Sequence, residues 1–286
     1  GSGKSSLLIE AFYPIVSAAL DGSELKSRRL SFKEIAGVDK VGRIMMVTQT
    51  AIGKTARSCP ATYINIMPMI RELFAGLTDA KIRGYGPGRF GFNASGGRCE
   101  ACRGLGVKKL EMSFLPELEV PCPVCEGKRY NSETLRVKYN GFSIADVLEM
   151  TASEAYNLFM NIPLLAKRLK ILAEVGLGYL KLGQSSVTLS GGESQRIKLT
   201  RELSRLSSKP TVYLLDEPTI GLHFDDIRKL IDVLHGLILK GNTVVVIEHN
   251  MEIIKAADYI IDLGPGGGKE GGRVLYQGEL KDLPAV

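Results

Sequence analysis

LSGGESQRIKL, at residues 189–199, indicates what class of protein this is. Ser190, Gly191 and Gly192 are expected to open a helix, whose free N–H groups and dipole favour a bound anion. Ser-Gly-Gly alone is also ordinary linker chemistry. Here Gln195 and Arg196 follow it, and an acidic strand end, DEP, lies at 216–218. Together these motifs predict an α/β protein that binds nucleotide phosphates.

The segments after this motif alternate between strand and helix patterns. PTVYLLDEP (210–218) predicts an apolar strand that ends in acids, IRKLIDVLHGLILKG (227–241) an amphipathic helix, and NTVVVIEHN (242–250) another apolar strand. Strand, helix and strand in this order predict parallel pairing through a right-handed crossover. At the end of the first strand, Asp216 is placed to hold Mg²⁺ through water and Glu217 to polarise an attacking water. Two acids there could otherwise be a helix cap or loop surface.

The chain begins with GSGKSS, which matches the end of the phosphate-loop pattern G-x-x-x-x-G-K-[ST]. Backbone N–H groups at the start of a helix can hold phosphate oxygens, Lys4 can reach the terminal phosphates, and the Ser5 hydroxyl can bind Mg²⁺. The first glycine of the pattern would precede residue 1, and the chain lacks an initial Met, so we expect it to be cut from a longer protein. The nucleotide-binding residues predicted here are Gly1, Ser2, Gly3, Lys4, Ser5 and Ser6.

Three other segments have clear patterns. Residues 5–20 predict a helix whose apolar strip is broken near Pro14, and RIMMVTQT (43–50) predicts a buried strand that runs into a loop. Residues 152–177 have helical periodicity, and Pro163 should divide them into two helices.

Four of the five cysteines form two pairs, Cys99-x-x-Cys102 and Cys122-x-x-Cys125, with nineteen residues between them. This spacing fits a tetrahedral Zn²⁺ site, and four thiolates leave no open position, so the metal should be structural. Disulfides are the alternative, although paired knuckles give poor disulfide geometry. The residues between the pairs, VKKLEMSFLPELEV, predict a hairpin. Cys59 is interpreted as an ordinary thiol.

The net charge of the 286-residue chain, +6, is concentrated in one segment. Residues 81–110 carry seven cationic side chains and one carboxylate, Glu100, so the remainder is neutral. A basic surface of this kind is typical of a protein that binds a polyanion, usually nucleic acid, although a solvated loop surface gives the same count.

The composition, 44% hydrophobic and 24% charged, is that of a globular protein large enough for one large or two smaller domains. No apolar run approaches the roughly 18 residues of a membrane span, and no secretion leader is present. A cytoplasmic location is therefore expected.

The motifs resemble those of ATP-binding cassette (ABC) ATPases, and they occur in the same order. LSGGESQRIKL resembles the signature motif, YLLDEP the Walker B motif, TIGLH (219–223) the D-loop, Gln49 the Q-loop glutamine and His249 the switch histidine. The resemblance implies ATP and Mg²⁺ as cofactors, with Glu217, His249 and Gln49 as catalytic residues. It also implies that the nucleotide lies between the phosphate loop of one cassette and the signature of another, so an isolated cassette should hydrolyse ATP poorly.

Nearly the whole chain resembles the second cassette of the UvrA family, the damage-recognition ATPases of bacterial nucleotide excision repair. About 140 residues separate Gln49 from the signature, which is too many for an ordinary transporter cassette. Stretches that carry the resemblance include KIRGYGPGRFGFN, GGRCEACRGLG, EMSFLPELEVPCPVCEGKRYN and VGLGYLKLGQSSVTLSGGESQRIKL. The chain departs from the family pattern around the Q-loop, at Thr48, Thr50 and Ala51, and at Cys59 and Gly266.

This second resemblance implies a subunit of the excision nuclease that binds distorted, damaged double-stranded DNA and loads UvrB. It implies a homodimer with two cassettes in each chain. DNA shape would be read rather than base sequence, which suits cations directed at phosphates. The predicted DNA-facing residues are Arg83, Arg89, Arg98, Lys108 and Lys109.

The expected fold is α/β: an ABC-type (P-loop) ATPase core with a mostly parallel sheet, interrupted by a helical insertion that carries a four-cysteine zinc module. We expect the core in residues 1–53 and 183–286, and the insertion in 54–182, with the zinc module at about 84–140. The alternatives are another ABC-family ATPase (a UvrA paralogue, or a cassette associated with transport or translation) and a DNA-binding module whose nucleotide site is vestigial.

Overall fold

The structure is a computed structural model that describes residues 2–23, 32–53, 55, 57–112, 115–204, 209–268 and 271–282. The chain forms two compact units. Unit 1 comprises Gly1–Gln49, Glu174–Gly176 and Arg205–Val286, and unit 2 comprises Thr50–Ala173 and Leu177–Ser204. Among the described residues, no helix is both long enough and apolar enough to cross a membrane.

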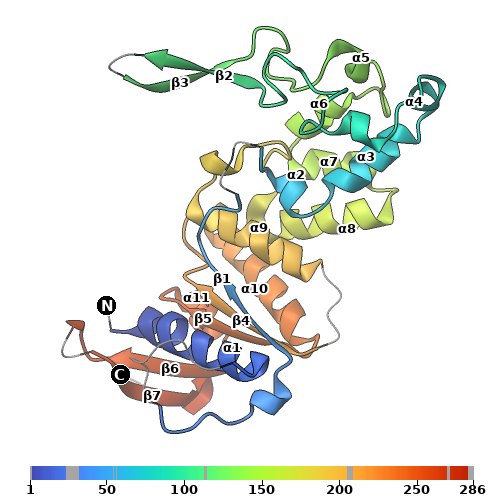
Figure 1. Ribbon diagram of the computed structural model, residues 1–286. Coiled ribbons are helices and arrows are strands. Elements are labelled where there is room, and N and C mark those ends of the chain that lie inside the picture. Colours follow the sequence, from blue (N-terminus) through green and yellow to red (C-terminus); the bar gives the residue numbers. More distant parts are fainter. Residues whose placement is uncertain are drawn as a thin grey trace. The chain divides into compact units, whose positions relative to one another are not determined.

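A three-stranded parallel sheet forms the centre of unit 1 (Figure 1). Its strands are β1 (Arg43–Val47), β4 (Thr211–Asp216) and β5 (Thr243–Ile247), in the order β1-β4-β5. The first five residues of β4 are buried, as expected for a strand paired on both sides. α10 (Phe224–Ile238) connects β4 to β5. The predicted strand-helix-strand unit with parallel pairing is thus confirmed.

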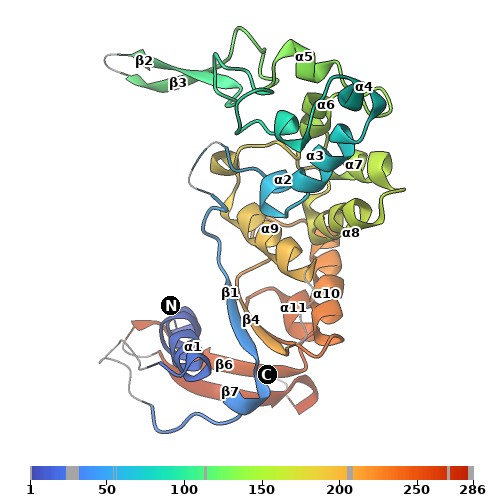
Figure 2. The same ribbon diagram turned by 45° about the vertical axis from the view of Figure 1, so that its right-hand side comes forward.

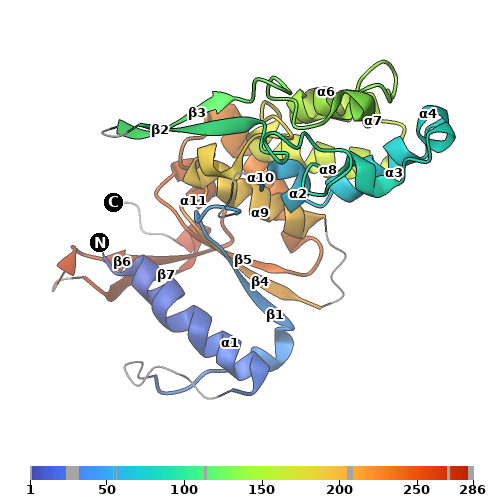
Figure 3. The same ribbon diagram turned by 45° about the horizontal axis from the view of Figure 1, so that its top comes forward.

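The helices of unit 1 pack through apolar residues at helical spacing. In α10 the buried residues are Ile227, Leu230, Leu234 and Leu237, and this helix packs on β5 and on α11 (Met251–Lys255), which lies beside it in Figure 2. Near the N-terminus, a π-helix (Ser6–Phe12) continues into α1 (Tyr13–Asp21), which lies against β1 (Figure 3).

The predicted N-terminal helix is present, and the backbone stays helical through Pro14. Pro14 lies in the first turn of α1, where its missing N–H costs little, and the wider π-helical turns precede it. Unit 1 is completed by α11 (Met251–Lys255), by short 3-10 turns (Val38–Lys40 and Leu280–Asp282), and by the antiparallel pair β6 (Tyr259–Gly264) and β7 (Arg273–Glu279).

Unit 2 is built mainly from short helices. In chain order these are α2 (Pro60–Tyr63), α3 (Met67–Ala75), α4 (Thr78–Ile82), α5 (Ser132–Leu135), α6 (Ile144–Glu149), α7 (Ala152–Phe159), α8 (Pro163–Leu172) and α9 (Gly191–Leu203). Short 3-10 turns lie at Pro87–Phe90 and Ser186–Thr188, and the π-helical turn Ala173–Leu177 has its middle residues, Glu174–Gly176, in unit 1. Pro163 begins α8, which confirms the predicted division of residues 152–177.

The helices α6, α7 and α9 of unit 2 begin with the same reciprocal cap, made by a hydroxyl and an acid. Ser143, Thr151 and Ser190 each accept a hydrogen bond from the backbone N–H three residues later, and the acid at that position accepts one from the backbone N–H of the cap. Such capping boxes define the start of helices that are too short to be stable alone.

The zinc-module segment carries a two-stranded antiparallel hairpin, β2 (Val107–Met112) and β3 (Leu115–Pro121). The hairpin predicted between the two cysteine pairs is therefore confirmed. The adjoining core contains aromatic pairs: the ring of Phe74 lies 5.6 Å from that of Phe90, and the ring of Phe92 lies 6.4 Å from that of Tyr130.

The packing of α8 gives a test of the unit 2 core. Leu172 is fully buried, whereas Leu164 on the same helix is 66% exposed. We expect Leu172→Ala to lower the free energy of unfolding by about 2–5 kcal/mol, because it leaves a cavity. Leu164→Ala should change it by less than about 0.5 kcal/mol. Denaturant unfolding followed by circular dichroism measures both, and equal losses would contradict the assigned packing.

Candidate nucleotide and metal sites

Three residues predicted for the nucleotide site are in contact, because Ser5 and Gln49 both hydrogen-bond Asp216. The Ser5 hydroxyl donates to Asp216 Oδ1 at 3.4 Å, and Gln49 Nε2 donates to the Asp216 carbonyl oxygen at 3.5 Å. Gln49 follows β1 and Asp216 ends β4, so the parallel pairing places both at one edge of the sheet. A hydroxyl and a carboxylate at this distance offer two hard oxygen ligands to a divalent cation.

The predicted phosphate loop lies at the start of the N-terminal helix. Gly3 has a φ of +92°, which side chains other than glycine rarely adopt, and its carbonyl accepts from Leu7 N at 2.9 Å in the first turn. Lys4 Nζ donates to Ser2 Oγ at 2.8 Å. Ser6 is the exposed first residue of the π-helix, and Gly1 lies outside the described residues.

Glu217 and His249 face one another across the ends of β4 and β5. His249 Nε2 lies 3.7 Å from Glu217 Oε1, and the two side chains are 68% and 40% exposed, respectively. Glu217 has a φ of +44°, and its N–H donates to the Ile247 carbonyl at 2.9 Å. A left-handed conformation at a residue other than glycine costs about 1–3 kcal/mol and is common where a side chain must be aimed at a ligand.

Ser190 is the N-cap of α9. Its hydroxyl accepts from Glu193 N at 3.2 Å and also hydrogen-bonds the Glu193 carboxylate. Glu193 accepts in turn from Ser190 N at 2.7 Å and from the Tyr179 hydroxyl at 2.6 Å. Burial opposes the charge on Glu193, but these bonds from Tyr179 and Ser190 hold the pKa of its carboxyl below the usual range. Gly191 and Gly192 form the first turn, as predicted, and leave the helix N-terminus without bulky side chains.

Lys198, on the same helix, contacts the residue that follows the Q-loop glutamine. Its Nζ donates to Thr50 Oγ1 at 2.6 Å, and burial lowers the pKa of Lys198. Sequence reasoning missed this contact, because the two residues are 148 positions apart.

The four predicted metal-ligating cysteines are brought together. Cys99, Cys102, Cys122 and Cys125 are all buried, and their Sγ atoms lie within 4.8 Å of one another. None of the five cysteines forms a disulfide. The N–H of Gly106 donates to Cys102 Sγ at 3.3 Å, the kind of outer contact that orients a thiolate ligand. Four sulfurs in this arrangement fit a tetrahedral metal ion.

The two Cys-x-x-Cys turns share one backbone pattern. Each is followed by two residues of positive φ: Arg103 (+51°) and Gly104 (+80°), then Glu126 (+49°) and Gly127 (+85°). A Cβ at residue 104 would lie 1.8 Å from the Phe92 carbonyl oxygen, so that glycine is required for close approach. The repeat indicates that both halves are built for the same ligation.

The chain is similar to known proteins over nearly its whole length. UvrABC system protein A of Pseudomonas aeruginosa is 54% identical over 287 residues, which cover 99% of this chain and 30% of that protein. The protein of the same name from Thermus thermophilus is 54% identical over 283 residues, with the same coverage. A crystal structure of UvrA2 from Deinococcus radiodurans superposes with a TM-score of 0.85 at 46% identity, covering 98% of this chain and 33% of that one.

The chain belongs to the UvrA family. It spans 30% of the length of each of these two curated relatives. No model of a protein family matches the sequence. The resemblance to UvrA and the predicted fold class, an α/β ATPase-type core with a parallel sheet and an insertion with four clustered cysteines, are therefore confirmed.

In this UvrA-family chain, Arg89 and Arg98, two of the cations predicted to face DNA, pair with carboxylates. Arg89 donates to Glu133 at 2.8 Å and stacks over the Tyr85 ring, and Arg98 donates to both oxygens of Glu100. The side chains of Arg89 and Arg98 are 20% and 19% exposed. The other three, Arg83, Lys108 and Lys109, lie on exposed positions, the two lysines on β2.

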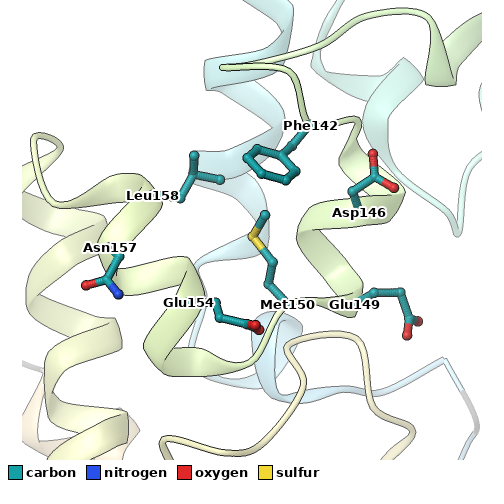
Figure 4. A pocket seen from close by; sticks show the side chains of 7 residues that line it. All are labelled: Phe142, Asp146, Glu149, Met150, Glu154, Asn157 and Leu158. Atoms are coloured by element: carbon teal, nitrogen blue, oxygen red, sulfur yellow. The ribbon is translucent and has the colours of Figure 1, made fainter.

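A hollow of about 540 Å³ lies on unit 2 between α6 and α7 (Figure 4). Its apolar lining is Phe142, Met150 and Leu158, and its acids are Asp146, Glu149 and Glu154. Each of these acids already has a structural contact. Asp146 and Glu154 complete the capping boxes of α6 and α7, and Glu149 pairs with Lys181 at 3.1 Å. The acidic rim is thus explained by helix capping and an ion pair, without a ligand.

Proposed function

We propose that this chain is the ATP-binding and ATP-hydrolysing part of a UvrA-like protein of the UvrABC system. The observation that carries the proposal is the 3.4 Å contact between the Ser5 hydroxyl and the Asp216 carboxylate. In P-loop ATPases a hydroxyl after the loop lysine and an acid at a strand end hold Mg²⁺ beside the nucleotide phosphates. The Mg²⁺, when bound, supplies charge neutralisation on the phosphate oxygens.

The remaining residues of unit 1 then have separate roles. The backbone N–H groups of residues 1–6 and the Lys4 ammonium bind phosphate oxygens. Glu217 accepts a proton from the attacking water, and His249, 3.7 Å away, orients that carboxylate and contacts the transferred phosphoryl group. Gln49 lies beside Asp216, where its amide can detect whether the cation site is filled.

The signature residues serve a different nucleotide. Gly191 and Gly192 offer backbone N–H groups at the start of α9, which has thirteen residues, and Ser190 caps that helix. We assign this anion site to the nucleotide held by the phosphate loop of a second cassette, as in other ABC ATPases. The complete active site is therefore shared between two cassettes.

The four-cysteine cluster is proposed to hold one structural Zn²⁺. Zinc prefers a tetrahedral set of thiolates, and all four sulfurs are buried. The ion would tie together the two turns from which the β2–β3 hairpin extends. This module would couple the nucleotide state of the ATPase unit to the binding of DNA.

The role of the whole protein follows from the family. We propose that it is a cytoplasmic homodimer that takes part in nucleotide excision repair, binds damaged double-stranded DNA and loads UvrB. Cations on the hairpin would contact DNA phosphates, which fits recognition of duplex shape rather than sequence. The UvrA paralogue is the alternative, and it would share the ATPase chemistry but differ in the DNA it binds.

The division of the active site predicts how Glu217→Gln behaves. With a second cassette present, ATP hydrolysis at this site should fall by about 10²–10⁴-fold, because the amide cannot accept the proton of water. ATP binding should persist. Glu279→Gln, an exposed change in β7, is the matched control. Phosphate release and equilibrium nucleotide binding measure the two effects. Rapid hydrolysis by the isolated chain, abolished by Glu217→Gln, would contradict the two-cassette proposal.

The metal site predicts a zinc content of one per chain. Cys122→Ser should lose the metal and loosen the hairpin module while ATP binding is retained, because the ligand is removed from a local site. Cys59→Ala removes a buried thiol outside the cluster and should keep the zinc. Elemental analysis of the folded protein measures the ion, and less than about half a zinc per chain would count against the site.

The hairpin lysines predict the salt dependence of DNA binding. Neutralising Lys108 and Lys109 together should reduce the slope of log K against log salt by about two, because each phosphate contact releases about one counterion. Replacing Lys167 and Lys240, which are also exposed, removes the same charge elsewhere and should leave the slope unchanged. Fluorescence anisotropy at several salt concentrations measures both. Equal slopes for the two double variants would assign the hairpin lysines to general surface charge.

A further inference from the structure

Glu248, between β5 and His249, holds two functional segments with one carboxylate. Its Oε1 accepts from Thr219 N at 2.9 Å and from Thr219 Oγ1 at 2.6 Å. Its Oε2 accepts from His249 N at 3.0 Å and from Asn250 N at 3.2 Å. Both oxygens are therefore saturated by donors from two segments that are 29 residues apart.

These bonds close a ring around the residues assigned to hydrolysis. Thr219 lies two positions after Glu217, and Glu248 directly precedes His249. The ring is completed by the backbone bond from Glu217 N to the Ile247 carbonyl at 2.9 Å and by the 3.7 Å approach of His249 Nε2 to Glu217 Oε1. A shift of Glu248 would therefore move both ends of the Glu217–His249 pair.

The chemistry of the contact favours a carboxylate over any neutral side chain. All four partners are donors, and only an ionised carboxylate accepts on both oxygens without presenting a donor of its own. An apolar residue of similar size would leave three backbone N–H groups without their partner. A simple helix cap would need only the bonds to residues 249 and 250, so the bonds to Thr219 point to a second role.

We propose that Glu248 is a positioning residue for ATP hydrolysis, which sets the distance between Glu217 and His249 by joining the segment after β4 to the segment after β5. The inference rests on the proposed function, because it assigns Glu248 to that active site. Glu248 does not itself contact the nucleotide. It acts by fixing the backbone on which Glu217 and His249 are held, and small displacements of catalytic groups reduce turnover strongly.

A positioning role and a purely structural role predict different kinetics. Loss of positioning should lower kcat while the KM for ATP stays within about twofold, because the phosphate loop and Asp216 are not part of the ring. A general loss of folding would lower the amount of active protein and the midpoint of thermal unfolding. It would not change the kcat of the remaining active sites, which titration with a tight-binding nucleotide analogue counts.

The experiment uses the intact protein with its second cassette and compares Glu248→Gln, Glu248→Ala and the control Glu252→Gln. Glu252 lies four residues further along and pairs with Lys255 at 3.6 Å, outside the ring. We expect kcat per active site to fall about tenfold for Glu248→Gln, which keeps one acceptor oxygen, and about a hundredfold for Glu248→Ala. The control should retain the wild-type value.

A double variant tests whether Glu248 acts on kcat through its hydrogen bonds to Thr219. Thr219→Val removes the hydroxyl donor and should lower kcat by itself, and adding it to Glu248→Ala should cause no further loss. If the wild type does not hydrolyse ATP, the proposed function fails. If the wild type is active, a Glu248→Gln protein with wild-type kcat, or additive effects of Thr219→Val and Glu248→Ala, would overturn the positioning role.

Discussion

The parallel pairing of β4 with β1 on one side and β5 on the other determines where the predicted nucleotide-site residues of unit 1 lie. Because all three strands point the same way, the residues that follow them emerge at one edge of the sheet. Gln49, Asp216 and His249 come from three distant parts of the sequence, and each lies at the C-terminal end of one of these strands or just beyond it. Ser5, from the start of the N-terminal helix, reaches the same edge and donates to Asp216.

Unit 2 is stabilised by different means. Its helices are short, and several of them start at capping boxes that replace intrinsic helix stability with local hydrogen bonds. The cysteine module lies beside a small aromatic core around Phe92 and Tyr130, and its turns require glycine and positive φ. A metal ion bound by the four thiolates, as proposed, would supply folding free energy that a segment of this size cannot obtain from apolar burial alone.

Much of this could be predicted from the sequence, because the signals are local. The apolar runs TVYLLD and TVVVI specify buried strands, and the Cys-x-x-Cys spacing specifies the sulfur cluster. The contacts that were missed are tertiary: Glu248 with Thr219, and Lys198 with Thr50, join residues whose proximity no local pattern encodes. Arg89 and Arg98 show the converse, since a positive charge in the sequence does not reveal the carboxylate that pairs with it in the fold.

The peptide bond between Gln49 and Thr50 joins unit 1 to unit 2 in the sequence. Gln49 is the last residue of its segment of unit 1 and donates to the carbonyl of Asp216, while Thr50 begins unit 2 and accepts from Lys198 on α9. One peptide bond therefore separates a contact within the first unit from a contact within the second. Because a planar peptide leaves only two soft dihedrals for each residue, a displacement of either anchor must be absorbed within a few bonds. The Q-loop glutamine is thus constrained from both directions, by its own hydrogen bond to Asp216 and by the anchored residue that follows it.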